Sequence, residues 1–252
     1  MLLYLNIIRR KTLKIFAISD LHLSFGSNKP MEVFGGNWEN YLEQIQADWA
    51  EKVGDEDLVL IAGDISWAMK LEETKLDFEF LAKLKGKKVI IRGNHDFWWS
   101  SISNVRDRLP ENVFAIQNDA MKFGDVIICG TRGWTVPEDI NNQSAEDEKI
   151  YKRELIRLEL TLQSAQKLRQ NGEQIICMIH YPPFNSSRKE SEFTALFEKF
   201  GVSKVVYGHL HGGKSRANLQ LTINNIEYYL TSCDQINNRL VLVNGDECEV
   251  EV

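Results

Sequence analysis

The chain has 252 residues and a formal net charge of −6, because 30 Lys and Arg residues stand against 36 Asp and Glu residues. Its 43% apolar and 26% charged residues are typical of an ordinary globular protein. A chain of this length buries enough apolar surface to fold without a disulfide or a structural metal. We find no internal repeat, low-complexity tract or linker, so we predict a single domain spanning residues 1–252.

The apolar pattern argues against a membrane-spanning or secreted protein. Uninterrupted apolar runs such as 175–179 fall far short of the roughly 20 residues that cross a bilayer. The apolar residues 1–8 precede the basic residues 9–11, whereas a signal peptide carries its charges first and a small-residue cleavage site last. We therefore interpret the start as an extra edge strand or a poorly ordered segment, and we expect no transmembrane segment.

Net charge and cysteine usage exclude further classes of protein. An acidic chain without a long basic run is not typical of a dedicated nucleic-acid binder. The four cysteines are widely spaced and form no C-x-x-C pair: Cys129, Cys177, Cys233 and Cys248. We predict that they are reduced thiols in a cytoplasmic protein.

Strand-like runs and helical patterns alternate along the first 210 residues. We predict strands at 14–19, 58–62, 89–92, 126–129, 175–179 and 204–207. Between them we predict helices at 38–49, at 76–84 with Leu76, Phe80 and Leu84 buried, from a Ser144 cap toward Gly172, and at 193–200. Three strands follow, at 219–223, 226–231 and 239–243. This order predicts an α/β fold in which helices flank a central pair of sheets.

Five of these strand-like runs end at polar residues of similar chemistry. The residues in question are Asp20-x-His22, Gly63-Asp64, Gly93-Asn94-His95-Asp96, His180 and Gly208-His209-x-His211. Ligands of open α/β sheets bind beyond the carboxyl ends of the strands, where several loops meet. We therefore expect the five groups to reach one crevice, with the three glycines allowing sharp turns.

The histidines sharpen this prediction, because all five in the chain lie at these strand ends. In extended chain, residues i and i+2 project to the same side, so Asp20 with His22 and His209 with His211 can each present paired donors. Carboxylate, amide and imidazole donors without thiolate suit Mn, Fe or Zn. Seven candidate ligands exceed the need of one ion but suit two ions about 3.5–4 Å apart that share a carboxylate.

In this order the five groups resemble the motif set of the calcineurin-like metallophosphoesterases, over residues 20 to 211. Each motif is weak alone, whereas the ordered set is highly specific. The resemblance implies a four-layer α/β/β/α sandwich of two mixed β-sheets flanked by helices. It also implies the hydrolysis of phosphate esters at a dinuclear metal centre, with Mn as the first expectation and Fe or Zn as alternatives.

Carried over residue by residue, the resemblance implies a role for each candidate. It assigns Asp20, His22 and His211 to one metal, Asn94, His180 and His209 to the other, and Asp64 to a bridge between them. His95 is implied to lie near the leaving-group oxygen, where it stabilises charge or donates a proton. Two cations lower the pKa of a bridging water, so that hydroxide attacks phosphorus in line.

The chain departs from the protein Ser/Thr phosphatase branch of that superfamily at Trp67. That branch has an Asp at this position, and the Asp supports the catalytic His; here the motif reads Gly63-Asp64-Ile65-Ser66-Trp67. We therefore do not expect protein phosphatase activity. Asp96 is left with two interpretations, as a residue that orients His95 or as the cap of the following helix.

Aromatic residues and one arginine near the motifs bear on substrate binding. Five tryptophans lie close to these motifs or to glycine turns, and they pack in the core or wall a cleft for an aromatic or sugar group: Trp38, Trp67, Trp98, Trp99 and Trp134. Arg132 either holds a substrate phosphate or is a solvated surface charge. The expected partner is a small phosphorylated substrate, with a nucleotide as one candidate.

Two other functions compete with phosphate-ester hydrolysis. The apolar and basic start suggests a hydrolase of a nucleotide-linked pyrophosphate at the membrane surface. A non-catalytic scaffold of the same fold is the second alternative, although none of the ligand positions is missing. A nuclease is disfavoured by the acidic charge.

Overall fold

The computed structural model describes residues 13–139, 144–212 and 218–245. The expectation for residues 1–11 and the state of Cys248 lie outside these ranges. The three other cysteines, Cys129, Cys177 and Cys233, are buried free thiols. Across the described part of the chain, no helix combines the length and the apolar character needed to span a membrane.

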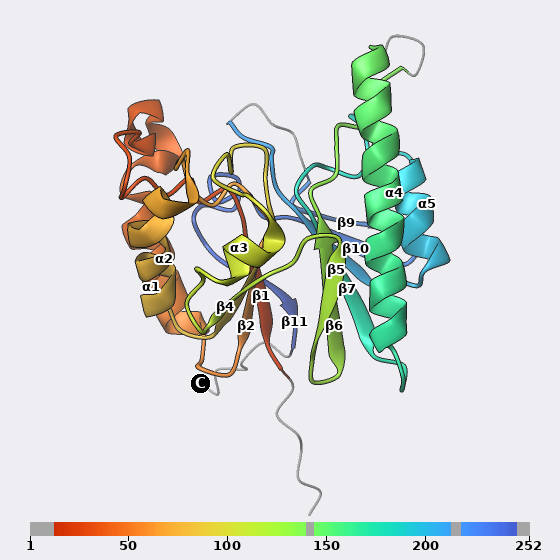
Figure 1. Cartoon of the computed structure of the whole chain (residues 1–252), viewed down its shortest axis with the longest axis horizontal. Coiled ribbons are helices and arrows are strands. Elements are labelled where there is room, and N and C mark those ends of the chain that lie inside the picture. The colour runs from red at the N-terminus through yellow and green to blue at the C-terminus, as the bar shows by residue number, and fades with distance from the viewer. Residues whose placement is uncertain (1–12, 140–143, 213–217, 246–252) are drawn as a thin grey trace, which may run out of the picture.

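Two β-sheets pack face to face between two layers of helices (Figure 1). The first sheet has the strand order β11-β1-β2-β3-β4, and the second has the order β5-β6-β7-β8-β10-β9. The strands of the first sheet are β1 (Ile15–Ile18), β2 (Leu58–Ile61), β3 (Lys87–Ile90), β4 (Val113–Ala115) and β11 (Val241–Asn244). The strands of the second are β5 (Asp119–Phe123), β6 (Val126–Thr131), β7 (Gln174–Ile179), β8 (Lys204–Tyr207), β9 (Gln220–Ile223) and β10 (Ile226–Leu230).

Both sheets are mixed, with parallel strands at their centres. Strands β1 to β4 run parallel, as do β6, β7, β8 and β10, whereas β11, β5 and β9 pair antiparallel with their neighbours. The parallel centre follows from the βαβ alternation, since a helical crossover returns the chain to the same end of the sheet. The predicted four-layer fold is confirmed.

The helices cover the outer faces of the sheets. They are α1 (Tyr41–Lys52), α2 (Lys75–Lys83), α3 (Ile102–Arg106), α4 (Ala145–Leu168) and α5 (Glu192–Lys199), with 3-10 turns at Met31–Phe34, Gly36–Trp38 and Leu71–Thr74. In Figure 1, α1 and α2 lie outside the first sheet, and α4 and α5 lie outside the second. Ser144 caps α4 as predicted, since its hydroxyl accepts a hydrogen bond from the Asp147 N–H at 3.0 Å.

Three apolar clusters fill the spaces between the four layers. Alternate residues of β1 illustrate the division: Ile15 and Ala17 pack between the sheets, whereas Phe16 and Ile18 face the helices. The second sheet packs on α4 and α5 through residues such as Leu158 and Phe197. This period-two burial keeps central strands such as β1 and β2 apolar on both faces, as expected for strands covered on both sides, whereas the edge strands β5 and β9 are partly exposed.

The predicted buried face of the helix at 76–84 is wrong for Leu76 and Phe80, although Leu84 is buried as expected. Leu76 is 49% exposed and Phe80 is only partly buried, whereas Phe78 and Leu81 enter the core. Asp77 explains the rotation, because its buried carboxylate accepts hydrogen bonds from the Phe25 N–H at 3.0 Å and from the Ser66 hydroxyl. These bonds turn the Asp77 side of α2 inward and leave Leu76 outside.

Candidate metal centre

The predicted strand ends converge on one edge of the sandwich. Strands β1, β2 and β3 of the first sheet and β7 and β8 of the second end there. The two sheets are joined at this edge, because Ser19, after β1, bridges to Ser232, after β10, and its N–H donates to the Thr231 carbonyl at 2.8 Å. Loops from both sheets are therefore held within contact distance.

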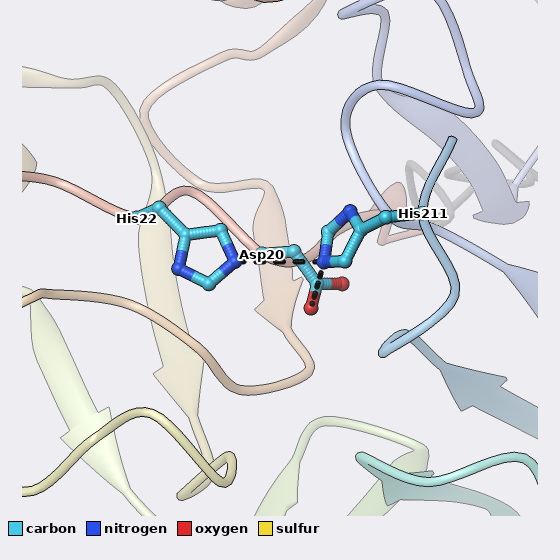
Figure 2. Close-up of side chains that lie close together, drawn as sticks. All are labelled: Asp20, His22 and His211. Atoms are coloured by element: carbon cyan, nitrogen blue, oxygen red, sulfur yellow. Dashed lines mark hydrogen bonds and ion pairs between the residues drawn. The ribbon is translucent and has the colours of Figure 1, made fainter. Parts of the chain in front are cut away.

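Asp20, His22 and His211 form the first cluster of donors (Figure 2). The His211 Nε2 atom lies 3.4 Å from Asp20 Oδ1 and 3.5 Å from His22 Nε2. Figure 2 shows the two imidazoles facing each other above the Asp20 carboxylate. These are the three residues predicted to hold one metal, and their donor atoms lie within 4.8 Å of one another.

Asp64 lies between this cluster and a second one. Its Oδ2 atom is 3.8 Å from His22 Nε2 and 3.6 Å from His180 Nε2. Asn94 Oδ1 in turn lies 2.7 Å from His180 Nε2 and 2.8 Å from His209 Nδ1. The structure thus brings all seven predicted ligands into one neighbourhood, with the Asp64 carboxylate between the two groups.

The backbone at this edge is unusual. Four of the seven residues have a positive φ: Asp20 at 59°, His22 at 47°, Asp64 at 51° and His209 at 74°. Non-glycine residues rarely adopt this left-handed conformation, and when they do they cluster at functional sites. Hydrogen bonds hold it, since Asp20 N–H donates to the Gly63 carbonyl and His22 N–H to the Asp64 carbonyl, at 2.9 and 3.0 Å. Four of the eleven non-glycine residues with a positive φ in the described part of the chain are therefore predicted metal ligands.

Two of the three motif glycines are required for space rather than for a sharp turn. A Cβ atom on Gly93 would collide with the Asp64 carboxylate, and one on Gly208 would collide with Asp20 Oδ2 and Ser19 Oγ. Of the three, Gly63 alone has a positive φ, of 95°, as the turn prediction supposed. The motif glycines therefore let neighbouring loops press directly against the carboxylates.

Two histidines are oriented by a fixed partner on their second ring nitrogen. His180 Nδ1 donates to the Ala62 carbonyl at 2.9 Å, and His211 Nδ1 lies 2.9 Å from Asp234 Oδ1. A carbonyl or a carboxylate can only accept, so in both rings Nδ1 carries a hydrogen and Nε2 is the nitrogen directed at the cluster. Sequence analysis missed Asp234, which follows β10 and belongs to none of the five strand-end motifs.

Asp96 performs neither of the two roles expected for it. It is fully buried, and its carboxylate accepts hydrogen bonds from the N–H groups of Ile65, Ser66 and Gly93 and from the Trp98 indole at 2.8–3.1 Å. The following helix is capped instead by Ser101. Asp96 therefore ties the loop after β2 to the loop after β3, and so sets Asp64 against Asn94.

His95 and Trp67 lie together beside the donors. The His95 backbone N–H donates to Asp64 Oδ1 at 2.7 Å, and its ring centroid lies 4.7 Å from that of Trp67. The Trp67 ring also stacks on His22, with centroids 4.8 Å apart and planes 19° from parallel. The tryptophan that replaces the expected Asp thus packs against both histidines.

The electrostatics of the cluster favour a cation. Burial lowers the pKa of His22 to about 3 and that of His209 to about 4, so both imidazoles are neutral at pH 7 and offer lone pairs. Burial also raises the pKa of Asp64, as do the nearby charges of Asp96 and Asp20. For His211, burial is outweighed by hydrogen bonds to Asp20 and Asp234, which raise its pKa to about 10. Facing imidazole nitrogens and crowded carboxylates are stabilised by a positive charge between them, so the donor set fits divalent metal ions.

A cleft of about 820 Å³ opens beside His22, His95 and His211. Trp38 and Trp67 line it, together with Met31, Phe34 and the Gly35-Gly36 turn. Of the other tryptophans near the motifs, Trp98 and Trp99 are buried in the core, and Trp134 lies against Tyr181 and Arg132. The cleft-wall interpretation therefore applies to two of the five tryptophans.

Arg132, the predicted phosphate-binding residue, does not line this cleft. Its guanidinium lies 3.4 Å from the carboxylate of the buried Glu154 and 5.0 Å from the Trp134 ring centroid. Its backbone carbonyl accepts from the His180 N–H at 3.0 Å, so the residue is adjacent to the metal-ligand candidates while its side chain lines another cavity.

Comparisons with known proteins bear on the fold and the family of the chain. The chain is similar in structure to the protein TT1561 of Thermus thermophilus, with a TM-score of 0.57 and 13% identity over 93% of this chain and 99% of that one. A protein of unknown function from Aquifex aeolicus, AQ665, gives a TM-score of 0.49 and 12% identity over 91% and 95% of the two chains. No curated protein is significantly similar in sequence. The model of one family, described as calcineurin-like phosphoesterase, matches residues 13–213 and so includes all seven candidate ligands; the chain belongs to the calcineurin-like phosphoesterase family.

Proposed function

We propose that this protein is a cytoplasmic hydrolase that cleaves phosphate esters, monoesters or diesters, at a pair of divalent metal ions. The observation that carries the proposal is the position of Asp64, whose carboxylate lies within 4 Å of His22 in one donor cluster and of His180 in the other. One carboxylate between two imidazole-containing clusters is the arrangement that a bridged dinuclear centre needs.

The proposed ligands divide into two sets around Asp64. Asp20, His22 and His211 would hold one ion, and Asn94, His180 and His209 would hold the other. Oxygen and imidazole donors without thiolate favour Mn, with Fe or Zn as alternatives. When bound, two such ions lower the pKa of a water and neutralise the phosphoryl oxygens, which supplies an in-line nucleophile at neutral pH.

The protein's own residues orient the reaction. His95 lines the cleft, and its backbone is fixed by Asp64, so its ring can stabilise the charge that develops on the leaving-group oxygen or donate a proton to it. Trp38 and Trp67 offer aromatic surface on the walls of the cleft. The substrate that fits is a small phosphorylated molecule with an aryl, sugar or nucleoside group.

The test is Mn-dependent hydrolysis of an aryl phosphate and a bis-aryl phosphate. We expect Asp64→Asn to lower kcat by about a thousandfold, because the shared ligand is lost, and His95→Ala to lower it by about a hundredfold. The matched control is Asp55→Asn, an exposed carboxylate in a turn. Inactivity of the metal-loaded protein on a broad panel of esters would refute the proposal.

The alternatives are separated by simple measurements. A non-catalytic scaffold would contain no metal when purified without chelator and would show no high-affinity uptake. A pyrophosphate hydrolase acting at the membrane surface would co-sediment with vesicles and cleave nucleotide-linked pyrophosphates in preference to simple esters.

A further inference from the structure

A second cavity, of about 280 Å³, lies at the same edge of the sandwich. It shares no lining residue with the cleft of about 820 Å³ beside His22, His95 and His211. We call it the basic cavity, because four arginines line it: Arg92, Arg132, Arg153 and Arg157. Arg92 follows β3 and Arg132 follows β6, while Arg153 and Arg157 lie one turn apart on α4. Three elements distant in sequence therefore direct guanidinium groups to one place.

The charges around the basic cavity do not balance. Glu154 is its one acidic lining residue, and its Oε1 atom lies 2.5 Å from Arg157 and 3.4 Å from Arg132. In the part of the chain that the structure describes, neither Arg92 nor Arg153 has a carboxylate within ion-pair distance. One carboxylate against four guanidiniums leaves a formal excess of three positive charges.

Hydrogen bonding is incomplete as well. The buried Arg92 Nε atom has no partner, and neither has Glu154 Oε2, although Glu154 is 1% exposed. Buried donors and acceptors are normally satisfied, so atoms left without a partner in a lined cavity point to a ligand. The free Arg92 N–H matches an acceptor such as a phosphate oxygen.

A purely structural role explains only part of this arrangement. Arg132 and Arg157 compensate the buried Glu154, as a buried carboxylate requires. Arg153 is exposed, and neither Arg153 nor Arg92 lies within ion-pair distance of Glu154, so an ion pair with Glu154 does not account for either. Like charges gathered around a cavity repel one another unless an anion occupies it.

We propose that the basic cavity binds a phosphate-type anion, either free phosphate or a second phosphate group of the substrate. Several guanidiniums around one concave site provide the planar, charge-assisted hydrogen bonds that phosphate oxygens accept. Arg92 precedes Gly93-Asn94 directly, and the Arg132 carbonyl binds the His180 N–H, so the cavity lies close to two proposed metal ligands. This proximity is what links the cavity to the substrate.

The direct test is isothermal titration of metal-free protein, kept in chelator at low salt, with inorganic phosphate and pyrophosphate. We expect saturable binding that weakens as salt is added. Arg153→Gln removes an unpaired guanidinium and weakens binding about tenfold, because a charge-assisted hydrogen bond is lost. Glu154→Gln removes the single opposing charge and tightens binding, a change of sign that loss of structure cannot produce.

The matched control is Arg108→Gln, which removes the same charge from a surface arginine paired with Glu72 outside the basic cavity. It leaves phosphate binding unchanged. Each variant is first compared with the unaltered protein by thermal unfolding. Absence of saturable binding, or equal weakening by Arg153→Gln and Arg108→Gln, would overturn the proposal.

A kinetic measurement decides whether the anion is free phosphate or a phosphate group of the substrate. This measurement alone rests on the proposed hydrolase activity. If the basic cavity binds part of the substrate, Arg153→Gln in the Mn-loaded protein raises KM for an aryl phosphate that carries a second phosphate group. It leaves KM for the simple aryl phosphate unchanged. Unchanged KM for both, together with the altered titration, identifies free phosphate as the ligand. Failure of hydrolysis would refute the proposed function and leave the titration result standing.

Discussion

The two sheets contribute differently to the edge they share. The first sheet supplies every oxygen donor, Asp20, Asp64 and Asn94, whereas the second supplies only imidazoles. Short carboxylate and amide side chains must be brought close by the backbone, and two of these three residues have a positive φ. Longer imidazoles can be aimed from a distance by a partner on the second ring nitrogen. Loop shape thus positions the first half of the centre. In the second half, hydrogen bonds aim the His180 and His211 rings, and a positive φ of 74° places His209.

The half of the centre that comes from the first sheet should lose the most stability when Asp96, which joins its two loops by hydrogen bonds, is removed. Asp96→Ala leaves three backbone N–H groups and the Trp98 indole without their buried acceptor. We expect a loss of about 3 kcal/mol or more in the free energy of unfolding, measured by urea denaturation. Asp55→Asn, on the surface, should change it by less than about 0.5 kcal/mol. Equal effects would show that the two loops hold their shape without Asp96.

The second-sheet half should lose metal affinity rather than stability. Asp234→Ala removes the carboxylate that orients His211 and leaves its Nδ1 without a partner. We expect Mn affinity to fall by about 10–100-fold, as for other partners of metal-binding histidines. The measurement is metal titration by calorimetry. Unchanged affinity would mean that the ring is held by packing alone.

The contact between the halves can be tested at a glycine. Gly208→Ala, in the second sheet, places a Cβ against Asp20 of the first, so we expect it to weaken metal binding and to destabilise the fold by about 1–3 kcal/mol. Gly124→Ala is the control, because Gly124 has a positive φ of 62° but open space around it. It should cost about 1 kcal/mol of stability and leave metal binding intact.

The smallest expected effect lies at the opposite end of the second sheet. Lys122 and backbone N–H groups of the preceding turn lower the pKa of Glu173 to about 2. A lowered pKa in the folded state contributes stability that is present above about pH 4.5 and is lost as the pH falls toward 2. Glu173→Gln should therefore flatten the decline of stability across that window, measured by denaturation at a series of pH values. Glu51→Gln, on an exposed helix end, should leave the decline as it is.

The strand-end prediction succeeded because it used a property that is local in sequence. Apolar runs identify strands, and the residue after each run must lie at a sheet edge, so Asp64 and Asn94 converge once β2 and β3 are parallel. His180 joins them only because the second sheet packs against the first. The prediction of the buried face of α2 failed because that face is set by contacts that are distant in sequence. Its rotation depends on hydrogen bonds from Phe25 and Ser66 to Asp77, which no periodicity within 76–84 contains.

The roles of Asp96 and Asp234 were beyond sequence analysis for the same physical reason. Asp96 lies in a motif, but its partners Ile65 and Ser66 follow a different strand. Asp234 meets His211 because the loop after β10 folds back beside the loop after β8. Such contacts are set by the approach of two loops, and a single chain segment carries no signal for them.

The order and chemical kind of the donors were determined by the sequence alone, since apolar runs specify where each strand ends and which side chain follows. Tertiary structure decided which donors meet, which imidazole nitrogen faces inward, and that four arginines from three elements surround a second cavity. Those features depend on side chains far apart in the chain coming within a few ångströms of one another. That approach is fixed only when the two sheets pack against each other.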